Sequence, residues 1–504
     1  MKFPALDIGA VLPLLIAATG ALAVLVADLL LRAHAARPAP RLTPELAGRG
    51  LALLSALFLA AAALFSAAAM PHAARNFNAD HPLVQLDALS AFCMAVLSLA
   101  AILACLLSVN YLRTLRIAHG EYYALLLVAV AGMFLLVCAV DMMAIFLGIE
   151  MLSIPIYVLA GFDRRKLRSN ESALKYFIVG SFASALMLYG IALLYGATGA
   201  TQLDAIREAF DAENPLAMIG AGLVVVGFTF KISSVPFHQW TPDVYEGAPT
   251  SVTAFMSVTV KLAAFAALLR VLGVAFVAAA EPLREILWLL AFLTMAVGNF
   301  MALVQDNVKR LLAYSSVAHA GYLLIGFAAA SADSYAAVLF YLMAYAPMNL
   351  GAFGVLMCLT RQGRDADRIE DLAGLAQRSP GLAAALTLFA VSLAGMPATV
   401  GFQAKFHLFV AAVRAEHVSI VVVAVLTSLV SFYYYLRLVV FMYMREPGEN
   451  APRPRVGSFE ALAIGFCAAA VVILGLLPNG DFAGLIGWLR TLDWARAAAL
   501  PALP

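Results

Sequence analysis

The chain has 504 residues, of which 64% are hydrophobic and only 12% are charged, and its mean hydropathy is +0.93. This composition is typical of a membrane protein and excludes a chain built around one large soluble core. The net charge of +2 gives no reason to expect a nucleic-acid partner.

Long apolar stretches follow one another along almost the whole chain. About 18 apolar residues are enough to cross the roughly 30 Å hydrocarbon layer. Because lipid offers the backbone no hydrogen bonds, such stretches predict helices, so the fold class is all-α, a polytopic membrane protein with about 14 transmembrane helices. In chain order the predicted spans cover residues 11–31, 50–70, 83–109, 122–140, 142–162, 170–198, 215–245, 251–280, 286–304, 311–330, 334–360, 381–413, 418–444 and 459–478.

Two of these spans are too long for one straight crossing. Residues 215–245 and 381–413 would each form a helix of about 50 Å, well beyond the hydrocarbon thickness. Pro236 lies near the middle of the first, and Gly395 and Pro397 lie near the middle of the second. We therefore predict that helices seven and twelve are interrupted. A break frees backbone groups that need water or a bound partner, which indicates a polar cavity beside each break.

The two interruptions occupy corresponding positions. Each falls in the fourth helix of a group of five, helices four to eight and nine to thirteen. Such a pair is typical of an internal repeat in transporters, and because five is odd the second group is inverted. We predict an N-terminal three-helix segment (1–115), a first five-helix repeat (116–280), a second, inverted repeat (281–445) and a C-terminal helix with a tail (446–504).

Basic residues are distributed unequally between the two sides. With 14 crossings, alternate loops fall on opposite sides, and most loop lysines and arginines fall on one of them, including Arg164, Arg165 and Lys166. This excess predicts that their side is cytoplasmic and that both termini are periplasmic. Trp240 and Trp288 lie near predicted span ends, where we expect them to anchor the chain at the membrane surface.

Five basic residues lie inside predicted spans: Lys175, Lys231, Lys261, Lys405 and Arg437. A charge at mid-membrane costs about 2.5–3.5 kcal/mol on insertion scales, so such residues usually face a protein interior or a hydrated path. Reaching to the membrane surface is the alternative, and it stays open for Lys175 and Arg437, which lie near span ends. For the three central lysines, Lys231, Lys261 and Lys405, we favour a functional site.

Other polar residues within the spans extend this prediction. Glu150 is an acid well inside a span, so it needs a cation, as the central lysines need an acid. His319 lies in the span between the helices of Lys261 and Lys405, and we predict a relay role, with a hydrogen-bonded interior histidine as the alternative. Tyrosines 433–435 either line a hydrated path or pack against neighbouring helices.

Nothing in the sequence indicates redox or metal chemistry in this chain. The five cysteines lie in apolar segments without CxxC spacing, so we expect small core residues and no iron–sulfur cluster or disulfide framework. The loops show no metal-ligand spacing and no nucleophile–base cluster. We therefore expect no cofactor and no metal in this chain.

Four stretches together resemble a known family. They read FLGIEMLSIPIYVLAGF (146–162), FKISSVPFHQWTPDVYEGAPTSVTAFMSVTVKLAAF (230–265), LLAYSSVAHAGYLLIG (311–326) and LAGMPATVGFQAKFHLF (393–409). The sequence resembles the antiporter-like membrane subunits of respiratory complex I, and within that group it is most similar to the subunit N family of bacterial NADH-quinone oxidoreductase. The lysine at 405, where M-type subunits typically have an acid, favours the N or L type. We expect no long lateral helix after the last span, which favours N.

The resemblance implies a proton-translocating subunit with one ion channel built from two inverted five-helix halves. Carried over motif by motif, it implies roles for the helix-five glutamate and for the lysines of helices seven, eight and twelve. The expected proton relay comprises Glu150, Lys175, Lys231, Lys261, His319 and Lys405. A carboxylate beside a buried ammonium favours its protonated form, so separating Glu150 from Lys231 would release a proton. We expect protons to pass from the cytoplasm by Lys231 to Lys405.

The same resemblance implies an obligate hetero-oligomer. The expected partners are other membrane subunits of complex I, in a bacterial inner membrane, with quinone reduction elsewhere as the driving reaction. The flavin mononucleotide, the iron–sulfur clusters and the quinone would belong to other subunits. Two alternatives stay open: a subunit of a multi-component Na⁺/H⁺ antiporter of the Mrp type, or of a membrane-bound hydrogenase.

Overall fold

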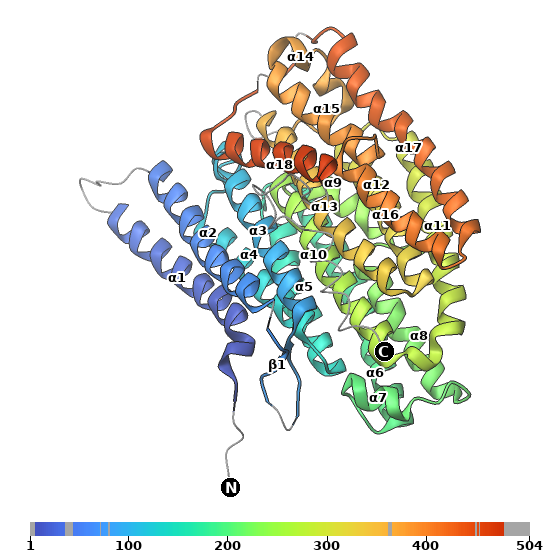
Figure 1. Ribbon diagram of the computed structural model, residues 1–504. Helices are drawn as coiled ribbons and strands as arrows, with labels where there is room; N and C mark the ends of the chain where they lie inside the picture. The colour runs from blue at the N-terminus through green and yellow to red at the C-terminus, as the bar shows by residue number, and fades with distance from the viewer. Residues whose placement is uncertain are drawn as a thin grey trace.

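The computed structural model describes residues 6–35, 44–70, 72–78, 81–360, 365–448, 451–452 and 454–477. Figure 1 shows a bundle of long helices, with α1 and α2 at one flank and α11 and α17 at the other. Within the described residues, 12 helices are long and apolar enough to cross a membrane, and these carry the predicted all-α fold. They are α1 (Leu12–Ala35), α2 (Pro44–Ala69), α3 (Ala88–Thr114), α4 (Gly120–Cys138), α5 (Met142–Ala160), α6 (Leu167–Thr198), α10 (Thr250–Arg270), α11 (Ala280–Leu303), α12 (Val308–Ala329), α13 (Ala332–Cys358), α17 (Val418–Met444) and α18 (Ser458–Leu476).

Both predicted interruptions are confirmed. Where the seventh and twelfth spans were expected, the chain forms α8 (Pro215–Lys231) and α9 (Trp240–Gly247), then α15 (Pro380–Ala394) and α16 (Val400–Arg414). We call these pairs the first and second broken segments. Pro236 lies between α8 and α9, and Ser233 there has a positive φ of 64°. Gly395, with φ 93°, and Pro397 separate α15 from α16. The count of 14 crossings and the inverted repeat stay predictions.

The remaining elements are short. They are the α-helices α7 (Leu203–Ala209) and α14 (Leu375–Arg378), the 3₁₀ helices η1 (Ile8–Val11), η3 (Val277–Ala279) and η4 (Ile369–Leu372), the π-helical turn η2 (Val271–Ala275), and the strands β1 (Arg75–Asn76) and β2 (Gln85–Leu86). The two strands pair antiparallel, with Arg75 opposite Leu86. These short elements connect the spans. A search for apolar stretches of about 18 residues cannot predict them.

The centre of the bundle is shielded from lipid. Every residue of α10 and nearly every residue of α12 and α13 is buried, whereas α1, α2 and α18 are about one third buried over their most apolar stretch. Figure 1 places α10 and α13 near the middle of the bundle. The five cysteines are buried, as expected for small core residues. Polar side chains on the central helices therefore face protein rather than lipid.

One buried ion pair fixes the ends of two packed helices. Arg270, at the end of α10, forms two hydrogen bonds of 2.7 and 2.9 Å with Asp87, which also caps the first turn of α3. Burial alone would raise the pKa of Asp87, but the Arg270 charge and hydrogen bonds from Arg270 and Ser90 hold it below its ordinary value. A two-pronged pair of this kind fixes the relative position of α3 and α10.

The expected interfacial position of Trp240 is wrong. Its ring is 5% exposed and stacks on Tyr176, with ring centroids 4.3 Å apart. Its Nε1 donates a hydrogen bond of 3.2 Å to the backbone carbonyl of Phe230 near the end of α8. The same carbonyl also accepts the backbone N–H of Ser233 at 3.1 Å, so Trp240 adds a second hydrogen bond to an acceptor beside the break and is held inside the protein.

Candidate functional site

Lys231 is the last residue of α8 and is 2% exposed. Its Nζ donates hydrogen bonds to Ser153 Oγ at 2.7 Å and to the Tyr157 hydroxyl at 3.3 Å, both on α5. The same atom lies 5.4–5.7 Å from the ring centroids of Tyr157, Tyr176 and Phe230. Hydroxyl oxygens and aromatic faces both stabilise a cation, so this pocket accepts the ammonium without a carboxylate.

The expected contact between Glu150 and Lys231 is not made. Glu150 lies three residues before Ser153 and seven before Tyr157, on the same face of α5, and is half-buried. Within the described part of the chain no ion pair joins Glu150 to Lys231, and Glu150 Oε1 is buried without a hydrogen-bond partner. Lys231 Nζ donates its hydrogen bonds to the Ser153 and Tyr157 hydroxyls instead. A buried oxygen without a partner is costly, and it marks a place for water or for the lysine itself.

Lys261 lies in the middle of α10 and is 3% exposed. Its Nζ donates to the backbone oxygen of Ser316 and, at 2.6 Å, to Ser316 Oγ on α12. The Tyr345 hydroxyl donates to the same Oγ at 3.0 Å. Asn349, one turn along α13, donates to Ser257 of α10 at 2.6 Å. The second central lysine is thus held by neutral oxygen atoms of α12, in contact with a polar face of α13.

His319 follows one turn after Ser316 on α12 and is 3% exposed. Its Nδ1 lies 2.7 Å from the Tyr341 hydroxyl and its Nε2 lies 3.3 Å from the Tyr435 hydroxyl. Its ring centroid is 5.2 Å from that of Tyr345, whose hydroxyl donates to Ser316, the partner of Lys261. A neutral histidine accepts a proton at one nitrogen and donates from the other, and here each nitrogen faces a hydroxyl.

Lys405 lies on α16, one side of the second break, and is 6% exposed. Its Nζ donates hydrogen bonds of 2.8 Å to the carbonyl of Ala394 and to Ser428 Oγ, and it lies 4.8 Å from the ring centroid of Tyr322. Ala394 is the last residue of α15, so its carbonyl is one of those freed by the break. Gly395 has a positive φ of 93°, and an added Cβ would lie 3.0 Å from the lysine Cδ, so another residue would strain the backbone and press on the lysine side chain.

His319 and Lys405 are joined through Tyr322. The Tyr322 ring centroid lies 5.9 Å from that of His319 and 4.8 Å from Lys405 Nζ. Its hydroxyl receives a hydrogen bond of 3.2 Å from Asn299, whose Oδ1 accepts one of 3.1 Å from Tyr434. The structure therefore places His319 between the second and third central lysines, as the sequence predicted. Tyr434 and Tyr435 join the same chain of polar side chains, through Asn299 and His319 respectively.

The first two central lysines are separated by aromatic rings. Tyr176 stacks on Trp240, whose ring centroid lies 6.5 Å from that of Tyr245, and the Tyr245 hydroxyl interacts with Ser316. Among the described residues no hydrogen-bonded chain of side chains crosses this stretch. The Tyr176 hydroxyl and Thr241 Oγ1 are buried there without partners. Buried polar atoms of this kind are commonly satisfied by internal water, which would complete the chain.

Lys175 is not brought into this chain. Its side chain is 45% exposed, and its Nζ lies 2.7 Å from Glu171 and 3.0 Å from Asp243. Arg437 pairs in the same way with Asp306 at 2.6 Å. Both residues lie near helix ends and pair with acids there. The surface position that the sequence offered as an alternative therefore fits Lys175 and Arg437 better than a place in the buried relay.

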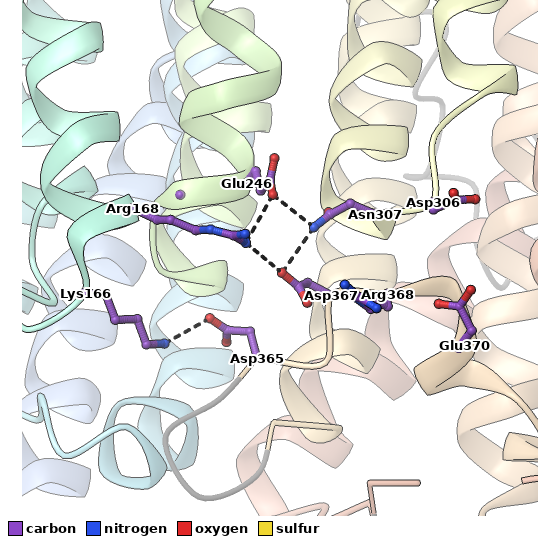
Figure 2. Close-up of a pocket in the computed structure, with 10 residues that line it drawn as sticks. Lys166, Arg168, Glu246, Asp306, Asn307, Asp365, Asp367, Arg368 and Glu370 are labelled. Atoms are coloured by element: carbon purple, nitrogen blue, oxygen red, sulfur yellow. Dashed lines mark hydrogen bonds and ion pairs between the residues drawn. The ribbon is translucent and has the colours of Figure 1, made fainter. Parts of the chain in front are cut away.

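A charged cavity of about 620 Å³ lies beside Lys175 and its partners. Figure 2 shows its lining: Lys166 points toward Asp365 at 3.3 Å, and Arg168 lies 3.3 Å from Glu246, which also contacts Asn307 at 3.4 Å. Three of these residues precede α10 in the chain, namely Lys166, Arg168 and Glu246. Asn307 and Asp365 follow it. The cavity wall therefore ties the two predicted halves together at one end of the bundle.

Asp365 is the best-satisfied acid of that wall. The Tyr111 hydroxyl donates to it at 2.8 Å and Thr250 Oγ1 at 3.3 Å. Burial alone would raise the pKa of Asp365, but the charges of Lys309 and Lys166 and the Tyr111 hydrogen bond hold it below its ordinary value of 3.8. The segment after α13 is thereby held against α3 and α10.

Sequence reasoning missed the serines that hold the central lysines. Ser153, Ser316 and Ser428 each accept a hydrogen bond from one of them. The position of Ser153 one helical turn after Glu150 was a usable signal. For the other two no signal existed, because their contacts depend on how α12 and α17 pack against helices far away in the sequence.

Comparison with known proteins places the chain among membrane subunits of respiratory complexes. Residues 139–431 match the family described as NADH:quinone oxidoreductase/Mrp antiporter, transmembrane. The chain is 47% identical over 400 residues to NADH-quinone oxidoreductase subunit N of Trichlorobacter lovleyi, covering 79% of this chain and 82% of the relative. It is 47% identical over 449 residues to subunit N 1 of Sorangium cellulosum, covering 85% and 88%.

Solved structures of different complexes have this fold, although their sequence identity to this chain differs. A chain of respiratory complex I from Thermus thermophilus with bound aureothin is 35% identical, covers 93% of this chain and 98% of its own, and has a TM-score of 0.78. A chain of the Mrp complex from Dietzia sp. DQ12-45-1b has a TM-score of 0.81 and covers 97% of each, but is only 23% identical. The second likeness shows the fold alone, so sequence identity separates the candidates where fold similarity does not.

Proposed function

The chain is a member of the NADH-quinone oxidoreductase subunit N family, and from this premise we propose that it carries protons across the bacterial inner membrane within a respiratory complex. Quinone reduction in other subunits would drive the transfer. One observation carries the proposal: three buried lysines and a buried histidine lie on central or broken helices, and Lys261, His319 and Lys405 are linked through shared hydroxyl and aromatic neighbours.

The partners of these lysines suit proton exchange. A buried ammonium that is held by neutral oxygen atoms keeps its charge at a cost, so a small change of partner shifts it between its protonated and neutral forms. Lys261 and Lys405 have only serine and backbone oxygen acceptors among the described residues. A lysine locked to a carboxylate would hold its proton more firmly.

The proposed direction runs from Lys231 to Lys405. A proton taken up from the cytoplasm near Lys231 crosses the aromatic stretch through internal water to Lys261, moves by His319 to Lys405 and leaves on the periplasmic side. Glu150 contributes by approaching Lys231 with its free oxygen, which would favour the protonated lysine, and by withdrawing to release the proton. Both termini would be periplasmic.

The remaining expectations complete the proposal. We assign no cofactor and no metal to this chain, and the flavin mononucleotide, iron–sulfur clusters and quinone to other subunits of an obligate hetero-oligomer. The two five-helix halves would be inverted copies. In support, α4 packs on α5 as α11 packs on α12, and α6 packs on α8 as α13 packs on α15.

The test is Lys231→Ala in the intact complex, reconstituted into vesicles. Proton uptake and quinone reductase turnover should fall together, by at least about tenfold, because one relay group of the series is lost. Lys175→Ala is the matched control, since it removes an exposed lysine from the same half of the chain. Assembly is checked by the subunit content of the purified complex. Normal turnover with an unchanged number of protons per electron would disprove a role for Lys231.

A further inference from the structure

A second large cavity lies away from the lysine chain. Its volume is about 1270 Å³, and it is lined by residues of α1, α4, α5 and α6 and the loops between them. This exceeds the roughly 300–1,000 Å³ that is typical of small-molecule pockets. A ligand that fills it would be large and would contact several transmembrane helices at once.

One wall of this cavity is apolar and exposed. Ile154 and Val158 on α5, with Leu174 and Phe177 on α6, line it, and each is about half exposed. Helices that face the membrane present such a surface to acyl chains.

The rim at the end of α5 is basic. Arg32, Arg116, Arg164 and Arg165 line it together with two acids. Both acids already have partners, because Arg32 pairs with Glu121 at 2.6 Å and Arg165 pairs with Asp163 at 3.0 Å. Arg116 and Arg164 are therefore left as exposed charges.

Arg116 and Arg164 have no acidic partner within the described residues. The first helical turns of α4 and α6 begin beside them, and neither the cap residue His119 nor Lys166 makes a side-chain capping bond. Helix N-termini and arginine side chains both favour a bound anion. The rim thus offers positive charge directly above an apolar wall.

We propose that this cavity binds one anionic phospholipid. Its phosphate would lie at Arg116 and Arg164, and an acyl chain would lie along Ile154, Val158 and Phe177. The charge pattern fits this occupant, since basic pockets between transmembrane helices at the cytoplasmic side bind anionic headgroups. An apolar segment of another subunit would leave the two arginines unpaired, and a free phosphate would leave the wall uncovered.

The test uses the intact complex in vesicles that contain phosphatidylglycerol with a photoactivatable acyl chain. Labelling should occur in the peptide that spans residues 150–180, and unlabelled phosphatidylglycerol should compete with it, whereas phosphatidylcholine should not. Equal competition by phosphatidylcholine would overturn the proposal in favour of neutral lipid. Competition by inorganic phosphate would overturn it in favour of a small anion. Absence of label in this peptide would show that another subunit covers the cavity.

A variant pair tests the headgroup contacts. Arg116→Gln combined with Arg164→Gln should weaken phosphatidylglycerol binding about 30-fold, which corresponds to about 1 kcal/mol for each arginine. The matched control is Arg445→Gln combined with Arg455→Gln, which removes two exposed arginines away from the cavity and should leave labelling unchanged. Unchanged labelling of the first variant would overturn the proposed headgroup site. The competition measured on the unsubstituted complex decides the question if that variant does not assemble.

Discussion

In the first broken segment α8 ends at Lys231 itself, and the ammonium lies against hydroxyls of Ser153 and Tyr157 on α5. In the second broken segment α15 ends at Ala394, and the lysine reaches back from α16, on the far side of the break, to bond that freed carbonyl. Both ammonium groups therefore lie at the C-terminal, negative end of a half-helix, where the helix dipole favours a cation.

The difference lies in what supplies the acceptors. Lys405 bonds to an oxygen that the break itself provides, and Ser428 adds a second bond of equal length. Lys231 donates both of its hydrogen bonds to side chains of α5, and the nearby acid Glu150 is not used in this arrangement. The second lysine site is thus built into its own segment, whereas the first can respond to movement of a neighbouring helix.

The largest expected effect tests whether the two sites act in series. Lys231→Ala and Lys405→Ala should each abolish most proton transfer, and the double variant should pump about as poorly as the worse single variant, because residues that act as a unit are non-additive. Proton uptake by vesicles that contain the complex is the measurement, after equal assembly is confirmed. Two independent paths would instead leave each single variant partly active and make the losses add.

Gly395→Ala tests the feature that only the second broken segment has. Gly395 has φ 93°, and an added Cβ would lie 3.0 Å from Lys405 Cδ, so backbone strain and contact with the lysine both oppose it. We expect turnover to fall about tenfold, with a stability cost on the order of 1–3 kcal/mol. Gly222→Ala on α8 is the control, because among the described residues its added Cβ would meet no atom within 4 Å other than its chain neighbours and the nearby backbone of its own helix. Equal behaviour of both variants would argue against a tight fit at Lys405.

A smaller effect should separate the two sites through their serines. Ser153→Ala removes the shorter bond of Lys231 and leaves one of 3.3 Å, whereas Ser428→Ala leaves Lys405 its 2.8 Å carbonyl bond. Because a hydrogen bond to a charged group contributes about 1.5–3 kcal/mol, the first variant should slow proton transfer several-fold more than the second.

Ser98→Ala is the control for the serine pair, since Ser98 is buried and its Oγ has no hydrogen-bond partner in the part of the chain that the structure describes. Its turnover should match that of the unsubstituted complex. A larger loss from Ser428→Ala than from Ser153→Ala would reverse the comparison between the two sites.

The smallest effect concerns the charged wall that joins the two halves. Asp365→Asn should lower the unfolding temperature by about 2 °C, because it removes the partner of Lys166 at 3.3 Å. The pKa of Asp365 lies below its ordinary value of 3.8, so its contribution is complete above that value and is lost only as pH falls through the folded-state pKa. The temperature difference should therefore be equal at about pH 8 and about pH 5.

Asp204→Asn is the control for the wall, since Asp204 pairs with Arg207 in an exposed position and should change nothing measurable. A temperature difference that shrinks between those two pH values would show that Asp365 titrates higher than its contacts imply.

Local chemistry made some features predictable from the sequence. The breaks follow from Pro236, Gly395 and Pro397, because proline and glycine act on their own stretch of backbone. The burial of Lys261 and Lys405 follows from the cost of a charge in lipid. These predictions need no knowledge of which helices are neighbours.

Pairwise contacts were not predictable in the same way. Glu150 was expected to meet Lys231, yet Ser153 and Tyr157 from the same helix face do so. Trp240 was expected at the membrane surface, yet it is buried and donates a hydrogen bond to the Phe230 carbonyl near the end of α8. Each outcome depends on the rotation and depth of packed helices, and a difference of one helical turn changes the partner.

The three shielded helices also bear on how the chain enters the membrane during synthesis. Within the described residues, α12 and α13 are the least apolar of the long spans, and α10 carries Lys261 and Arg270. Released alone into lipid, each would expose polar groups to hydrocarbon. The order of the chain removes this difficulty, because α10 packs on α3, α4 and α5, α12 packs on α11, and α13 packs on α3 and α10. Every polar helix is thus synthesised after helices that can receive it.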